Sequence, residues 1–151
     1  MSNDPFVSEL IALDQALGGE FPLIVGGGYG LVLRQRHLRA SRARTRREFP
    51  AARSTQDIDL FVQLEMLLDV DRVEQFRAAL DALGYKPIEA AKYYQFAREL
   101  EYLGQKRSLK IDLLARVPET TAERSALKAD VRRVRNRAFS HLHAHATPEA
   151  L

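Results

Sequence analysis

The chain has 151 residues, of which 46% are hydrophobic and 28% charged, with 8 Gly and 6 Pro. These values are typical of one globular domain and exclude a disordered or fibrous chain. The absence of Cys excludes disulfide bonds, zinc–thiolate sites, iron–sulfur clusters and cysteine nucleophiles. The sequence has no apolar run long enough to cross a membrane and no signal peptide, so we expect a cytoplasmic protein without a membrane partner.

The net charge of +3 is distributed unevenly along the chain. Residues 34–53 contain eight Arg and one Glu, a net charge of +7, whereas the other residues hold 15 basic and 19 acidic side chains, a net charge of −4. A basic segment on an acidic domain indicates a charged partner. The segment could bind RNA through its phosphates, bind an acidic protein, or form a solvated mobile loop. If it binds nucleic acid, the candidate contacts are Arg42, Arg44, Arg46 and Arg47.

Helical and strand patterns alternate along the chain. In chain order, the predicted elements are a helix over 5–17, a strand over 21–25, a helix over 31–38, a strand over 57–62, a helix over 69–83, strands over 93–102 and 108–114, a helix over 121–137 and a strand over 139–145. Between the second helix and the second strand, residues 39–53 are expected to form a loop or a loose helical extension. This order predicts an α+β fold, a two-layer unit in which helices flank a mixed β-sheet.

Two aspartates alternate with aliphatic residues on the strand predicted over 57–62. Asp57 and Asp59 are two residues apart, so both carboxylates point to the same face, where they repel each other. A divalent cation reverses this repulsion, and Mg²⁺ prefers carboxylate and phosphate oxygens. Asp112 repeats the pattern with Lys110 on its face, so neighbouring strands would bring three carboxylates and one ammonium together. Alternatively, Asp57 and Asp59 lie on the solvated face of an edge strand.

Three glycines, Gly26, Gly27 and Gly28, follow the strand predicted over 21–25. At a strand-to-helix junction, backbone N–H groups and the helix dipole suit an anion such as a triphosphate. Tight packing of helix against strand explains the glycines equally well. The dinucleotide-binding fingerprint is excluded because Leu31 and Leu33 occupy the positions of its third glycine, and a P-loop is excluded because Gly-Lys-Ser/Thr is missing.

The combination of these motifs resembles the nucleotidyltransferase superfamily. Gly26-Gly27 ends a strand, Arg53-Ser54-Thr55-Gln56-Asp57-Ile58-Asp59 follows a helix, and Asp112 lies between hydrophobic residues on a later strand. The pattern is most similar to the AbiEii-type toxin nucleotidyltransferases of bacterial toxin–antitoxin and abortive-infection systems. The resemblance implies a nucleotidyltransferase-like single domain over 1–151 with its core at about 21–115.

The resemblance also implies an activity and a set of site residues. The expected enzyme uses Mg²⁺ or Mn²⁺ to move a nucleoside monophosphate from a nucleoside triphosphate to an acceptor hydroxyl. The acceptor would be RNA or tRNA, and an antitoxin protein would be a further partner. By resemblance, the catalytic and metal-binding residues are Asp57, Asp59 and Asp112. The implied nucleotide-binding residues are Gly26, Gly27, Gly28, Arg53, Thr55 and Lys110.

Three features differ from the family pattern. Gly27 replaces the usual Ser of the superfamily, and about thirty residues separate the glycines from Asp57. The later motifs of the family, which include a lysine in a helical C-terminal part, are not found in the sequence. In addition, Thr147 and Pro148 are typical of the N-cap and first position of a helix, just before the sequence ends. The chain could therefore be the N-terminal part of a longer protein. The alternative function is a catalytically inactive module of the same fold that binds nucleic acid or an antitoxin.

Two further groups of side chains give weaker signals. His141, His143 and His145 share one face of the strand predicted over 139–145 and could ligate zinc, although a surface strand is the better explanation. We expect Tyr93, Tyr94 and Phe96 to belong to the core of the sheet rather than to stack on bases.

Overall fold

The computed structural model describes residues 4–42, 57–130, 132–137 and 141–148. Of these, 42% are helical and 31% lie in strands, and the strands form one mixed sheet. The fold is therefore α+β, as the sequence predicts. Within the described ranges, no helix is both long and apolar enough to cross a membrane.

The elements differ in length from two to fourteen residues. The helices are α1 (Pro5–Ala16), α2 (Gly27–Ala40), α3 (Leu64–Leu68), α4 (Val70–Ala82) and α5 (Thr121–Ala126), together with a 3-10 turn, η1 (Glu89–Ala91). The strands are β1 (Ile24–Val25), β2 (Asp57–Phe61), β3 (Lys86–Pro87), β4 (Gln95–Tyr102), β5 (Gln105–Ala115), β6 (Leu127–Ala129), β7 (Arg133–Asn136) and β8 (His143–Ala146).

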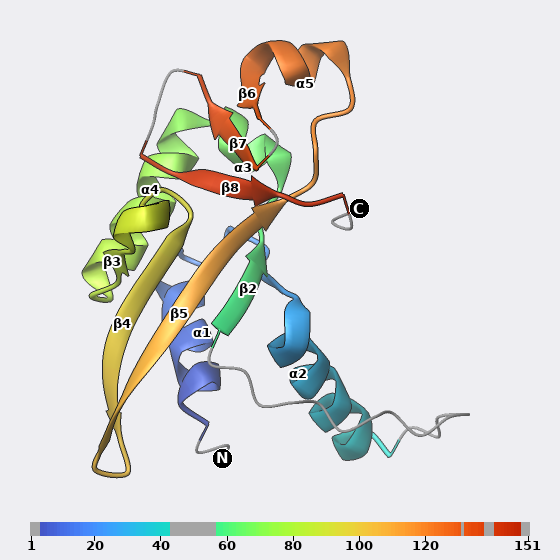
Figure 1. The fold of residues 1–151 in the computed structure, drawn as a ribbon. Coiled ribbons are helices and arrows are strands. Elements are labelled where there is room, and N and C mark those ends of the chain that lie inside the picture. The colour runs from blue at the N-terminus through green and yellow to red at the C-terminus, as the bar shows by residue number, and fades with distance from the viewer. Residues whose placement is uncertain (1–3, 43–56, 131, 138–140, 149–151) are drawn as a thin grey trace.

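The long strand β5 is the centre of the sheet (Figure 1). It pairs in parallel with β2 on one side and antiparallel with β4 on the other, and β4 also pairs with β3. The last residues of β5, beyond those that pair with β4, pair in parallel with β8. In turn, β8 pairs antiparallel with β7, and β7 pairs antiparallel with β6. The strand β1 pairs antiparallel with β2. The two parallel strands β2 and β5 therefore lie side by side with partners on both flanks.

One face of β2 and β5 belongs to the hydrophobic core. Alternate residues of these strands are fully buried, among them Ile58 and Ile111, and they join one cluster with Leu13 of α1 and Phe76 of α4. In Figure 1, α1 passes behind β4 and β5. Because side chains alternate along a strand, the residues between the buried ones project from the opposite face.

The prediction of one helix over 121–137 is wrong. The helix begins as expected, with a capping box between Thr120 and Glu123, but α5 ends at Ala126 and the chain continues into β6 and β7. Leu127 and Val134 are 1% and 0% exposed as strand residues of the sheet. Their spacing of seven residues equals about two helical turns, which is why the sequence pattern indicated a helix.

Other boundaries shift by a few residues. The second helix starts at Gly27 rather than near 31, and the first residues of the strand predicted over 93–102 form a turn after η1. The short helix α3 was not predicted, because five residues are too few to show a period. The Arg-rich stretch after Arg42 lies outside the described residues.

Candidate functional site

The aspartates singled out in the sequence lie on the sheet face opposite the core. In the parallel pair, Asp57 of β2 lies beside Lys110 of β5, and Asp59 lies beside Asp112. The neighbours Ile58 and Ile111 point into the core, so these four side chains project from the same face. The structure thus brings together all three predicted carboxylates and the predicted lysine.

The site holds more negative than positive charge. The ammonium of Lys110 lies 3.1 Å from Oδ2 of Asp112, and the two side chains are 29% and 16% exposed. The other oxygen of Asp112, Oδ1, is buried and accepts no hydrogen bond from any described residue. Burial raises the pKa of Asp59, and the charges of Asp112 and Asp57 raise it further, whereas Lys110 lowers it. A further cation or a proton donor would therefore stabilise these carboxylates.

The donor chemistry suits Mg²⁺, but the side chains are not arranged as a finished ligand set. Oxygen ligands from carboxylates are those that Mg²⁺ and Mn²⁺ prefer, and the unpartnered Oδ1 of Asp112 is such a ligand. Among the described residues, however, no group of three or more His, Asp or Glu side chains is placed to hold a metal ion. Since Lys110 already contacts Asp112, its ammonium would compete with a metal ion for that carboxylate.

The glycines bring the start of α2 against the carboxylate strand. The N–H of Gly26 donates a hydrogen bond to the carbonyl oxygen of Asp59 at 2.8 Å. Gly27 has φ +58°, and a Cβ added there would lie 1.8 Å from Oδ2 of Asp59. A Cβ on Gly26 would lie 2.0 Å from the ring of Phe61. Close packing thus explains Gly26, whereas the missing side chain of Gly27 leaves room for the carboxylate itself.

This packing places the N-terminus of a fourteen-residue helix at the site. The first N–H groups of an α-helix have no partner inside the helix, and the helix dipole adds partial positive charge there. The first turn of α2 includes Gly27 and Gly28 and contains no acidic residue, so Asp59 is the anion brought against it. The helix terminus can share a phosphate with the carboxylates if a cation offsets their charge.

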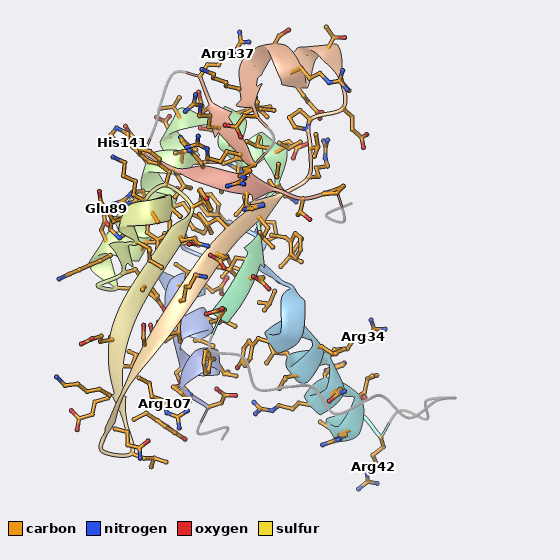
Figure 2. The ribbon with its side chains drawn as sticks, viewed as in Figure 1. Arg34, Arg42, Glu89, Arg107, Arg137 and His141 are labelled. Atoms are coloured by element: carbon orange, nitrogen blue, oxygen red, sulfur yellow. The ribbon has the colours of Figure 1, made fainter. Side chains whose placement is uncertain are left out.

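The structure places only part of the predicted basic and nucleotide-binding residues. Arg42 is exposed just beyond the end of α2, with φ 52°. Figure 2 shows Arg34 on the part of α2 that extends away from the sheet, and Arg42 just beyond the end of that helix. Outside the described residues lie Arg44, Arg46, Arg47, Arg53 and Thr55.

Two polar residues lie beside the carboxylates: Gln95, which the sequence did not single out, and His145, which the sequence offered only as a zinc ligand. Gln95 of β4 lies opposite Asp112 in the antiparallel pair, so Asp59, Asp112 and Gln95 form a row across three strands. A cavity of about 440 Å³ is lined by Gln95 and Asp112 together with Tyr94 and His145, whose rings meet edge to face at 5.7 Å. Only the pairing of β4 and β8 with β5 reveals this cavity, because no local pattern links these residues.

The interpretation of the histidines as surface residues is wrong for His143. This side chain is fully buried against Tyr93, with a ring separation of 4.4 Å, and neither ring nitrogen has a described hydrogen-bond partner. Burial lowers the pKa of His143 to about 4, and the charges of Arg135 and Arg133 add to this effect. His143 is therefore neutral at pH 7, while His145 lines the cavity beside Asp112.

No protein-family model, curated protein or solved structure matches the chain. The resemblance to the nucleotidyltransferase superfamily therefore rests on the residues of this chain alone. Its motifs are the glycines at the start of α2, the two aspartates of β2, and Asp112 of β5, which is in register with Asp59.

Proposed function

We propose that the protein is a metal-dependent nucleotidyltransferase that moves a nucleoside monophosphate from a nucleoside triphosphate to a hydroxyl of RNA, such as a tRNA end. The observation that carries this proposal is the register of Asp59 with Asp112 on adjacent parallel strands, next to the start of α2. Paired carboxylates that hold Mg²⁺ and a helix N-terminus that binds phosphate are the groups this reaction needs. By resemblance, the proposal extends to a cytoplasmic, toxin-like component controlled by an antitoxin.

In the proposed reaction, the acceptor oxygen attacks the α-phosphorus in line with the departing pyrophosphate. The bond between the α-phosphorus and the oxygen that links it to the β-phosphorus breaks. The hydroxyl proton passes to a carboxylate of the site. Oδ1 of Asp112 is the candidate oxygen for Mg²⁺ on β5, because it has no hydrogen-bond partner among the described residues and belongs to a residue that lines the cavity. Asp57, Asp59 and Asp112 would hold Mg²⁺, which supplies charge neutralisation on the phosphates when bound. The first turn of α2 would face the triphosphate.

A transfer assay tests this proposal. The protein is incubated with total RNA, Mg²⁺ and each nucleoside triphosphate labelled at the α-phosphate, and label in RNA is measured. We expect label to enter RNA, and Asp59→Asn to lower the rate by about 100-fold or more. Asp71→Asn is the matched control, because Asp71 is an exposed aspartate of α4. If the unaltered protein transfers no label, or if both variants transfer equally, the proposal is wrong.

A second candidate function is a catalytically inactive module that binds nucleic acid or an antitoxin. It is favoured by the contact of Lys110 with Asp112 and by the lack, in the described part of the chain, of a three-residue ligand group. An inactive module would show salt-dependent RNA binding without Mg²⁺-dependent binding of nucleoside triphosphates. The same transfer assay, combined with a nucleotide-binding measurement, separates the two functions.

A further inference from the structure

A second cavity, of about 470 Å³, adjoins the cavity that contains Asp112. It is formed by η1, the turn that follows it and residues next to the ends of β6 and β7, and its lining includes Lys92, Tyr93, Arg132 and Arg133. Tyr94 lines both cavities. The two cavities therefore share one aromatic side chain, with Asp112 in the first cavity and three basic side chains in the second.

The lining of the second cavity has more basic than acidic side chains. Three basic side chains line it, Lys92, Arg132 and Arg133, and two carboxylates, Glu89 and Asp130. Asp130 forms an ion pair with Arg133, whose Nε lies 3.3 Å from Oδ2 of Asp130. Within the described ranges, Lys92 and Arg132 have no carboxylate at ion-pair distance. These two cations are available to a phosphate.

Hydrogen bonds hold the backbone of Arg132 and Arg133, which together with Lys92 form the basic wall of the second cavity. The carboxylate of Asp130 accepts hydrogen bonds from the N–H groups of Arg132 and Arg133 at 2.9 and 2.7 Å. The N–H of Ala146 donates to the carbonyl oxygen of Arg132 at 3.0 Å, which ties Arg132 to β8. The backbone of Arg132 and Arg133 is therefore held before a ligand binds, which favours affinity.

Two aromatic rings, those of Tyr93 and Tyr94, line the second cavity, and Tyr94 also lines the cavity of Asp112. The ammonium of Lys92 lies 5.1 Å from the ring centre of Tyr93, and the neighbouring ring of Tyr94 meets His145 at the cavity of Asp112. Aromatic rings next to cations are the combination that binds single-stranded nucleic acid, because bases stack on the rings and phosphates contact the cations.

We propose that the two cavities form one binding site for the single-stranded 3′ end of an RNA acceptor. The terminal nucleoside lies beside Asp112 with its base against Tyr94 and His145, and phosphates further along the strand contact Lys92 and Arg132. This inference rests on the proposed nucleotidyltransferase function, since it assigns the place of that reaction's acceptor.

An equilibrium binding measurement tests the site without requiring catalysis. The probe is a single-stranded RNA of about ten nucleotides that carries a fluorescent label at its 5′ end and has a free 3′ end. Its fluorescence anisotropy is measured with EDTA and without nucleoside triphosphate, over a series of salt concentrations. We expect the double variant Lys92→Gln/Arg132→Gln to weaken binding at least about fivefold and to reduce the salt slope by roughly 1.4, the value for two lost phosphate contacts.

The matched control is Lys106→Gln/Arg107→Gln, which removes the same charge at the tip of the β4–β5 hairpin. Figure 2 shows Arg107 at the end of the molecule far from Glu89, which lines the second cavity. The control should bind RNA as the unaltered protein does. Equal losses in both double variants would overturn the proposal, because they would indicate unspecific attraction, and so would RNA binding that neither variant changes.

Stacking on Tyr94 is tested separately. We expect Tyr94→Ala to weaken RNA binding at least about fivefold and Tyr94→Phe to restore it, because phenylalanine keeps the ring. A photoreactive base at the 3′ end should cross-link to residues of the Asp112 cavity. Cross-links confined to other parts of the protein, or binding of an acidic peptide but not RNA to the basic wall, would overturn the assignment.

The two proposals fail in different ways. If the proposed reaction is wrong, Mg²⁺-dependent transfer is absent although RNA binding responds to Lys92, Arg132 and Tyr94. If the acceptor site is wrong, transfer depends on Asp59, although substitution of Lys92, Arg132 and Tyr94 leaves RNA binding unchanged.

Discussion

At the scale of single residues, Gly27 determines how closely Asp59 approaches the helix terminus. We expect Gly27→Ala to lower the free energy of unfolding by about 2 kcal/mol or more, because its φ of +58° and the contact with Asp59 both disfavour a side chain. Urea unfolding measures this change. Gly84→Ala is the control, since Gly84 also has a positive φ but open space around it, and we expect it to cost only about 1 kcal/mol. Equal losses would contradict the close approach.

His143 makes stability depend on pH. Its pKa is about 4 in the folded protein and near 6.5 when unfolded, so the unfolded chain binds the proton first as pH falls. The stabilising effect of the neutral, buried ring is complete above pH 6.5 and is lost progressively down to about pH 4. Between pH 7 and 5 we expect a loss of about 2 kcal/mol from this group. Urea unfolding of His143→Leu at both pH values should show a correspondingly smaller loss; an identical loss would contradict the assignment.

The aspartates were predictable from sequence because their chemistry is visible at period two on single strands. Gln95 and His145 were not, since each becomes part of the site only through pairing with β5. The burial of His143 was also hidden, because a His-Ala-His-Ala strand has the composition of a surface.

At the scale of elements, the β2–β5 pair concentrates the carboxylates, and Lys110 partly neutralises them. Replacing Lys110 removes the cation that contacts Asp112. We therefore expect Lys110→Gln to lower Tm in EDTA by about 2–4 °C, the shift that about 1 kcal/mol causes in a protein of this size. Mg²⁺ should then raise the Tm of this variant more than that of the unaltered protein, because the metal no longer competes with the ammonium.

Thermal unfolding with EDTA and with Mg²⁺ measures this response. Lys128→Gln is the control, because Lys128 is exposed on β6. If Mg²⁺ shifts the Tm of all three proteins equally, Lys110 and the metal do not share a site.

The strands β2 and β5 were predictable because polar and aliphatic residues alternate in both, which few other structures explain. The strands β6 and β7 were not, since three and four residues rich in charge show no clear alternation. Leu127 and Val134 are buried through cross-strand pairing, a tertiary effect that overrides the local helical spacing.

At the scale of the whole molecule, two groups of basic side chains lie outside the carboxylate site. The carboxylates lie on the sheet, and α2 extends from them with the exposed arginines Arg34 and Arg39, followed by the exposed Arg42 beyond its end. The basic wall with Lys92 and Arg132 lies beside the carboxylates on the side of β8. A polyanionic acceptor would therefore be attracted to the protein by residues that leave the acidic centre itself unobstructed.

Metal binding tests the central claim most directly. Free Mn²⁺ is measured by electron paramagnetic resonance during titration of the protein with a nucleoside triphosphate present, correcting for Mn²⁺ bound by the nucleotide alone. We expect the unaltered protein and Asp71→Asn to bind Mn²⁺ equally, and Asp59→Asn to bind it at least about tenfold more weakly, because a ligand is lost. Equal binding by all three proteins, or no binding by any of them, would contradict a metal–nucleotide centre at Asp57, Asp59 and Asp112.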